Sequence, residues 1–120
     1  MKFIKRIDAV FVPVMDVEKS EQWYLTMFPF KVVFRSSDGI YVGFRFEDED
    51  EVKTALTIHK VDKMPEQPHA AFNFYVDDVD AVHSYLKEQN VEVGEIHGAE
   101  GMRFFNAQDP NGNKFEFVTF

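Results

Sequence analysis

Apart from its carboxylates, this 120-residue chain has few side chains suited to metal binding or acid–base chemistry, with 4 histidines and no cysteine. The lack of cysteine excludes disulfides, thiolate metal ligands and a cysteine nucleophile. His59, His69 and Glu116 would form a two-histidine, one-carboxylate metal site, provided that the fold brings them together. The sequence has no recognisable glycine-rich phosphate loop and no Ser-His-Asp pattern. Metal binding by these three residues, or acid–base chemistry by Glu116, is therefore the chemistry open to the chain.

Glu116 has two alternative roles. In a mostly apolar cavity without a metal, the loss of hydration favours the protonated form of a carboxylate and makes it a candidate general acid or base. A nearby cation, such as Arg45, Arg103 or Lys114, would instead hold it in a structural ion pair. Both roles stay open: Glu116 is the candidate catalytic residue, and a structural or ligand-contacting role is the alternative.

An internal repeat divides the chain into two halves that position these residues. A shift of 62 positions places residues 9–17 over residues 71–79, and both segments are alternating strands that run into Asp-Val. The same shift places Gly39 over Gly101, so a hairpin glycine recurs at the corresponding point. The pattern predicts a mixed α+β fold in a single domain of two tandem βαβββ modules, at about residues 5–62 and 68–120.

Each half begins with one strand and one helix. Asp16 is the predicted N-cap of a helix over residues 17–28, and Asp77 or Asp78 is that of a helix over residues 79–89. A carboxylate at this position accepts hydrogen bonds from the free amides of the first turn. Three strands then follow each helix, predicted at residues 30–35, 40–46 and 54–61 and at residues 91–97, 102–107 and 114–119.

Four segments in this order resemble the vicinal-oxygen-chelate superfamily of glyoxalases, bleomycin-resistance proteins and extradiol dioxygenases. They are FVPVMDVEKS (11–20), WYLTMFPF (23–30), FYVDDVDA (74–81) and DPNGNKFEF (109–117). The last is the closest match, to the family's D-P-D-G-N-x-hydrophobic-E-L. The resemblance implies that each module forms half of a curved open barrel around a cavity. It also implies a homodimer, because the family pairs modules between chains, which covers exposed sheet edges.

The resemblance also locates the family's metal ligands, which come from the first and last strand of each module. Those positions fall at Ala9, at Ala71, within the segment 54–57 (TALT), and at Glu116. A methyl group cannot coordinate a metal, and one carboxylate is far short of the three or four protein ligands expected. We therefore expect no metal and no cofactor at the family site. A displaced site formed by the two histidines and Glu116 is the alternative.

The leading prediction is a small-molecule binding protein without metal chemistry, like the bleomycin-resistance branch. One alternative is a metal-dependent lyase, isomerase or dioxygenase with a displaced site, and another is a metal-free acid–base enzyme that uses Glu116. A third is a structural or regulatory dimer whose cavity is filled by side chains. The predicted ligand-binding residues are Phe11, His59, His69, Asn73, Tyr75, Arg103 and Glu116.

Composition and charge exclude some classes of binding partner. A formal net charge of −8 argues against nucleic acid, because phosphate contacts need clustered Lys and Arg. No window approaches the ~18 apolar residues needed to cross a bilayer. The first residues also lack the apolar stretch of a signal peptide. We therefore expect a cytoplasmic protein with a small-molecule ligand and with neither a nucleic-acid nor a membrane partner.

Overall fold

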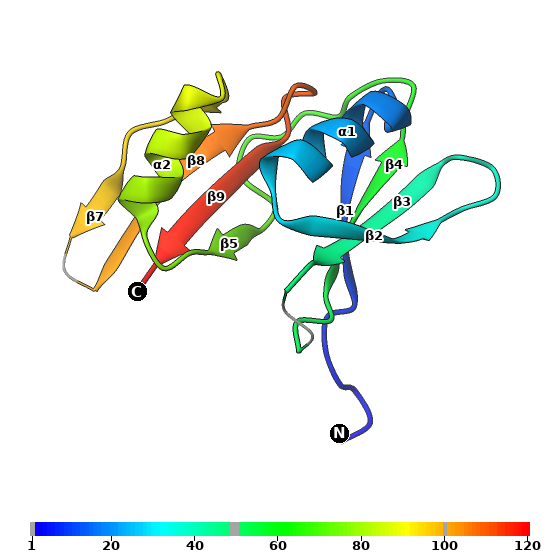
Figure 1. Ribbon diagram of the computed structural model, residues 1–120, viewed down its shortest axis with the longest axis horizontal. Coiled ribbons are helices and arrows are strands. Elements are labelled where there is room, and N and C mark those ends of the chain that lie inside the picture. The colour runs from blue at the N-terminus through cyan, green and yellow to red at the C-terminus, as the bar shows by residue number, and fades with distance from the viewer. Residues whose placement is uncertain (1, 49–50, 100) are drawn as a thin grey trace. The chain divides into compact units, whose positions relative to one another are not determined.

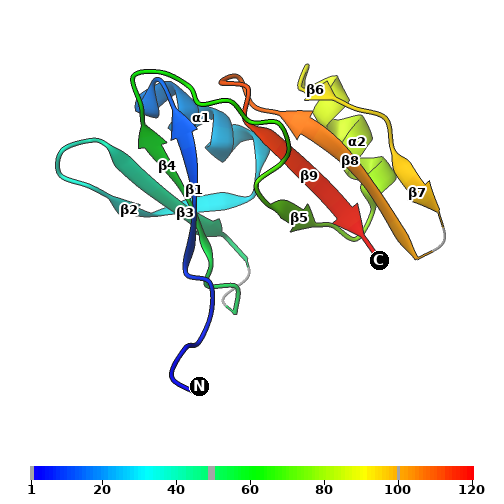
Figure 2. The same ribbon diagram turned by 180° about the vertical axis from the view of Figure 1, so that it is seen from behind.

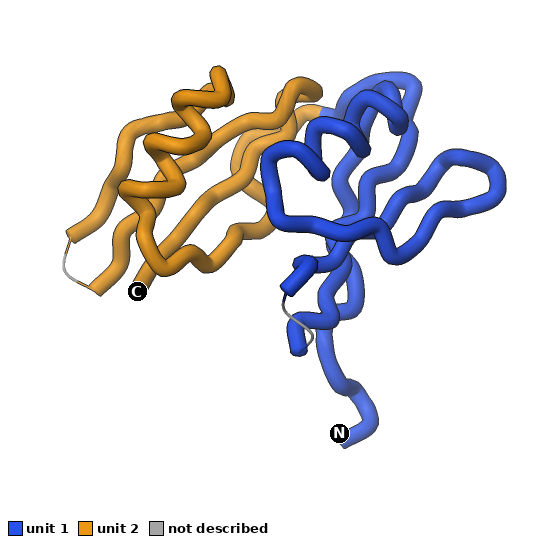
Figure 3. The backbone as a smooth tube through the Cα atoms, in the orientation of Figure 1, with its two compact units in different colours: residues 1–65 blue, residues 66–120 orange. Residues whose placement is uncertain are grey.

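The computed structural model describes residues 2–48, 51–99 and 101–120. The chain divides into two compact units, Met1–Pro65 and Glu66–Phe120, which we call unit 1 and unit 2 (Figure 3). In each unit one helix lies on one face of a sheet that mixes parallel and antiparallel strands (Figures 1 and 2). The predicted mixed α+β fold of two βαβββ modules with curved sheets is confirmed.

Unit 1 contains a sheet with the strand order β1-β4-β3-β2. The neighbours β1 and β4 are parallel, and the other pairs are antiparallel. Helix α1 packs against β2, β3 and β4 (Figure 1). Its elements are β1 (Ala9–Val14), α1 (Val17–Met27), β2 (Phe30–Arg35), β3 (Tyr41–Phe46) and β4 (Ala55–Lys60).

Unit 2 repeats this order of elements, with the strand order β5-β9-β8-β6 and with β7 also paired to β8. Here β5 and β9 are parallel, and α2 packs against β6, β8 and β9 (Figure 2). Its elements are β5 (Asn73–Tyr75), α2 (Val79–Glu88), β6 (Glu92–Val93), β7 (His97–Ala99), β8 (Met102–Gln108) and β9 (Lys114–Thr119).

The predicted continuous strand over residues 91–97 is wrong, because this segment forms the separate strands β6 and β7. Val93 lies opposite Ala107, and His97 lies opposite Phe104. Four residue steps from Val93 to His97 thus lie opposite only three steps along β8. The segment has one extra residue, and the ladder is interrupted as in a β-bulge. The amide of Gly94 still donates to the Asn106 carbonyl at 2.7 Å, after which the chain leaves the sheet.

Both helices begin at a capping aspartate. The Asp16 carboxylate accepts a hydrogen bond from the Lys19 amide at 3.1 Å, and Asp78 accepts one from the Ala81 amide at 3.0 Å. The second cap is therefore Asp78 rather than Asp77. Asp78 is also the residue that the 62-position shift places over Asp16. In the described part of the chain, neither helix is long and apolar enough to cross a membrane.

The face of each sheet that lies under its helix forms a hydrophobic core. In unit 1, fully buried Tyr24 of α1 stacks on Phe44 of β3 with 5.9 Å between ring centroids. In unit 2, Phe105 stacks on Phe117 at 5.0 Å beneath Val79 and Leu86 of α2. Each such side chain contributes about 1.5–3 kcal/mol on burial. Because strand residues alternate between faces, the residues between these core positions lie on the opposite face, which we call the open face.

Candidate functional site

The open face of unit 1 carries an exposed aromatic surface. Phe11 of β1 packs edge-on against His59 of β4, with 6.3 Å between ring centroids, and Tyr41 of β3 stacks on His59 at 6.1 Å. Phe11 is 59% exposed and Tyr41 is 40% exposed. The strand register causes this grouping, because Tyr41 lies directly opposite His59. Phe11 and His59 were predicted ligand-binding residues, whereas Tyr41 was missed although its alternation with buried Val42 and Phe44 marks it for this face.

The open face of unit 2 contains a pocket of about 400 Å³. Most of its side chains are polar, and they come from β6, β8, β9 and the segment before β5. Two of the predicted ligand-binding residues, His69 and Glu116, lie in its wall. The remaining lining residues are Pro68, Ala70, Glu92, Val93, Gly94, Asn106, Ala107, Gln108 and Lys114.

Glu116 lies in the middle of a row of polar side chains. On one side, Asn73 of β5 donates a hydrogen bond from Nδ2 to Glu116 Oε1 at 3.4 Å. On the other side, Asn106 of β8 lies directly opposite Glu116. Glu116 thus has amide neighbours in place of the mostly apolar cavity that motivated the acid–base prediction. Its catalytic role stays a prediction.

None of the three predicted cations forms an ion pair with Glu116 in the parts of the chain that the structure describes. Arg45 donates instead to the Lys53 carbonyl at 3.0 Å. Arg103 pairs with Asp80 of α2 through two hydrogen bonds of 2.7 and 3.0 Å. These hydrogen bonds lower the pKa of Asp80 below its usual value and raise the pKa of Arg103.

Arg103 lies on the helix side of its strand, away from the open face, and its role in ligand binding stays a prediction. It shares its side of β8 with buried Phe105 and Ala107, and its guanidinium lies against the helix. The open face of β8 instead presents Phe104, Asn106 and Gln108 to the opposite side. The sequence alone indicates that Arg103 lies on the buried side of β8, because the spacing between Arg103, Phe105 and Ala107 is two residues.

The other predicted residues of unit 2 lie on or beside its open face. Tyr75 is 54% exposed and packs edge-on against Phe120, with 5.2 Å between ring centroids. His69 is exposed at the pocket wall, where its Nδ1 lies 3.0 Å from the Ala70 carbonyl oxygen. Unit 2 thus brings together His69, Asn73, Tyr75 and Glu116, while Phe11 and His59 belong to unit 1.

The metal site of the fold family does not fit the residues present. Thr57 lies opposite Phe11 as Glu116 lies opposite Asn73, so in unit 1 a threonine occupies the place of the carboxylate of unit 2. Ala9 lies opposite Ala55, and neither methyl group is a metal donor. Within each unit, the described residues bring no three His, Asp or Glu side chains together.

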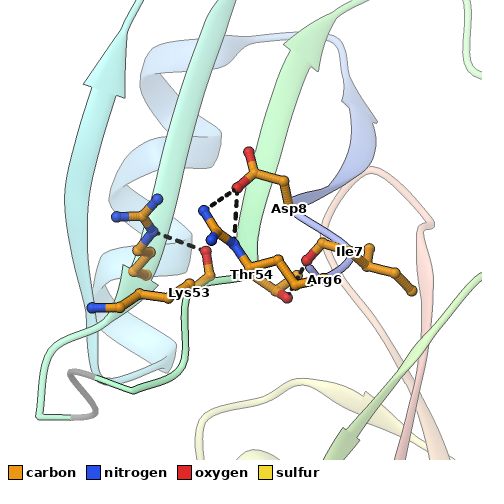
Figure 4. Close-up of polar contacts among 6 residues, drawn as sticks. Arg6, Ile7, Asp8, Lys53 and Thr54 are labelled. Carbon is orange, nitrogen blue, oxygen red and sulfur yellow. Dashed lines mark hydrogen bonds and ion pairs between the residues drawn. The ribbon is translucent and has the colours of Figure 1, made fainter. Parts of the chain in front are cut away.

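The remaining hydroxyl of the predicted ligand segment is engaged in structure. Thr54 Oγ1 donates to the Ile7 carbonyl at 2.5 Å and ties the start of β4 to the chain before β1 (Figure 4). The neighbouring Arg6 and Asp8 form an ion pair at 2.7 Å. At the family ligand positions this donor set offers a single carboxylate, Glu116, which is too few ligands to support a reaction step through a metal.

The order of elements in the two βαβββ modules and the match to a family model define the class of protein. The family model of the Glyoxalase/Bleomycin resistance protein/Dioxygenase superfamily matches residues 6–117, and the chain belongs to this superfamily. It is similar to a superfamily member from Sphaerobacter thermophilus DSM 20745, with a TM-score of 0.82, 20% identity and 98% of each chain covered.

Two solved structures from Streptomyces sp. CB03234 are also similar. One is TnmS3, an antibiotic binding protein, with a TM-score of 0.81, 23% identity, and 98% of this chain and 97% of that chain covered. The other is a glyoxalase/bleomycin resistance protein, with a TM-score of 0.71, 25% identity, and 92% of this chain and 97% of that chain covered.

Proposed function

We propose that this protein binds a small organic molecule in the pocket of unit 2, without metal chemistry. The observation that carries the proposal is the pocket of about 400 Å³ on the open face, with Glu116 and His69 in its wall. Small-molecule sites have volumes of about 300–1,000 Å³ and use a few converging polar groups to orient the ligand. The pocket has a volume in this range, and its lining is more polar than is usual for such sites.

Two further observations support binding rather than metal-dependent catalysis. At the family ligand positions, alanine and threonine leave Glu116 as the sole carboxylate. Among the similar folds, TnmS3 is an antibiotic binding protein, so this architecture accommodates ligand binding as a function. The fold alone does not decide the function, and therefore the pocket remains the main support for the proposal.

A ligand screen on chelator-treated protein tests this proposal. We expect compounds from a fragment library to shift the amide resonances of β6, β8 and β9 in ¹H–¹⁵N spectra recorded with EDTA present. The variant Asn106→Trp fills the pocket and should abolish these shifts. The matched control Ser84→Trp adds the same ring to α2, outside the pocket, and should retain them. Binding that vanishes with EDTA, or that survives in Asn106→Trp, would contradict the proposal.

A further inference from the structure

We propose that the pocket of unit 2 selects a small organic cation, one that carries a protonated amine, amidine or guanidine group. This inference rests on the proposed function, because it names the class of molecule that the same pocket binds. It comes from the charges of unit 2 and from the partners of the pocket's carboxylates.

The formal charge of the chain is concentrated in unit 2. Residues 66–120 contain ten Asp or Glu and three Lys or Arg, whereas residues 1–65 contain eleven and ten. Unit 2 therefore accounts for −7 of the formal net charge of −8. A concave site in a region of one sign concentrates ligands of the opposite sign and raises their rate of association.

Within the described chain, the carboxylates in the pocket lack a cationic partner. Glu92 and Glu116 both line it, and the basic residues that line it with them are Lys114 and His69. Among the residues that the structure describes, no ion pair joins Lys114 to either carboxylate. Glu116 accepts a long hydrogen bond of 3.4 Å from the neutral Asn73 amide. The other two Lys or Arg residues of unit 2 lie elsewhere, since Arg103 pairs with Asp80 and Lys87 belongs to α2.

The strand register places hydrogen-bonding amides beside these carboxylates. Asn106 lies opposite Glu116, and Gln108 lies opposite both Glu92 and Lys114. A planar amidinium or guanidinium donates two parallel N–H bonds to a carboxylate, which adds geometric specificity to the charge attraction. Its other N–H groups then find acceptors in the carbonyl oxygens of Asn106 and Gln108.

Lys114 limits the number of positive charges on the ligand. It lies two residues from Glu116 on the same face of β9, a separation of about 6.6 Å along the strand. A second cationic group at that end of the pocket would meet the ammonium. We therefore expect a ligand with one cationic group, and we expect removal of the Lys114 charge to tighten binding.

Benzamidine and benzamide provide a matched pair of probes, because they share a ring and a planar head group but differ in charge. Titrations followed by ¹H–¹⁵N spectra should show benzamidine shifting the resonances of Glu92, Asn106 and Glu116, with benzamide at least about tenfold weaker. The variants Glu116→Gln and Glu92→Gln should each weaken benzamidine by about threefold to tenfold or more, and Lys114→Gln should strengthen it.

Glu88→Gln is the control variant, since it removes the same charge from exposed Glu88 of α2, on the other face of the sheet. It should leave the affinity for benzamidine within about twofold, because Glu88 does not line the pocket and the attraction of an exposed charge is weakened by water and salt. An equal loss in Glu88→Gln and Glu116→Gln would show diffuse attraction and overturn the inference. So would Ca²⁺ or Mg²⁺ that shifts the same resonances at lower concentration than benzamidine.

The cation inference and the proposed function fail in different ways. If benzamide shifts the same resonances as strongly as benzamidine, the pocket binds small molecules but does not select a cation. If neither probe nor any library compound shifts them, the binding function itself is wrong. The result that we expect is selective shifts from benzamidine that require about threefold to tenfold more ligand in Glu116→Gln.

Discussion

Replacing the aspartate that caps α2 should destabilise the protein, whereas replacing its neighbour should not. Asp78 accepts a hydrogen bond from the Ala81 amide at 3.0 Å, while Asp77 is exposed. The helix has 10 residues, a length that is marginal without caps and tertiary packing. The variant Asp78→Ala should therefore lower the free energy of unfolding by about 1 kcal/mol. The corresponding fall in Tm is about 3–5 °C for a chain of this size.

The control Asp77→Ala removes the same charge from the adjacent residue and should change the free energy of unfolding by no more than about 0.5 kcal/mol. Asp78→Asn keeps a capping oxygen and should lie close to the wild type. Urea unfolding followed by circular dichroism at 222 nm measures all three variants at one protein concentration. If Asp77→Ala destabilises as much as Asp78→Ala, the assignment of the cap is wrong.

Two further substitutions and one mass measurement test other parts of the structure. Phe105→Ala should cost about 3–5 kcal/mol in urea unfolding, because Phe105 is fully buried and stacks on Phe117 at 5.0 Å. Asp80→Asn should be less stable than the wild type at pH 7. The difference in the free energy of unfolding between the two proteins should shrink as the pH falls below 3.8 and through the lowered pKa of Asp80, because protonated Asp80 loses its pairing with Arg103. Urea midpoints measured across this pH range test this. We also propose that the protein is a homodimer, as the family resemblance implies. Light scattering at micromolar concentration should then give twice the chain mass, and a mass near 14.0 kDa would contradict the homodimer.

Much of the fold could be predicted because local patterns and the fold agree. The alternating strands, the capping aspartates and the hairpin glycines are signals within a few residues of each other. Gly39 and Gly101 adopt φ values of +76° and +89°, in the left-handed region that favours glycine in such turns. The interruption between β6 and β7 was missed because the extra residue is defined only against the register of β8.

The site was less predictable for a related reason. Glu116 and His69 were both predicted to contact a ligand, and the pocket contains both. The pocket also contains Asn106, Gln108 and Glu92, which depend on the cross-strand register rather than on any motif. The two-residue spacing of β8 places Arg103 with Phe105 on the helix side of the sheet. That spacing is visible in the sequence, so the side of the strand that Arg103 occupies could have been predicted.

The interruption between β6 and β7 also affects how this protein behaves at high concentration. A continuous strand along that edge would offer an unbroken row of free amides and carbonyls, onto which another chain is able to add a strand. Here the edge consists of pieces of two and three residues separated by a bulge. A partner strand would therefore find no regular ladder to extend, which lowers the tendency of the sheet of unit 2 to nucleate aggregates. The interruption that the sequence pattern did not reveal thus favours solubility.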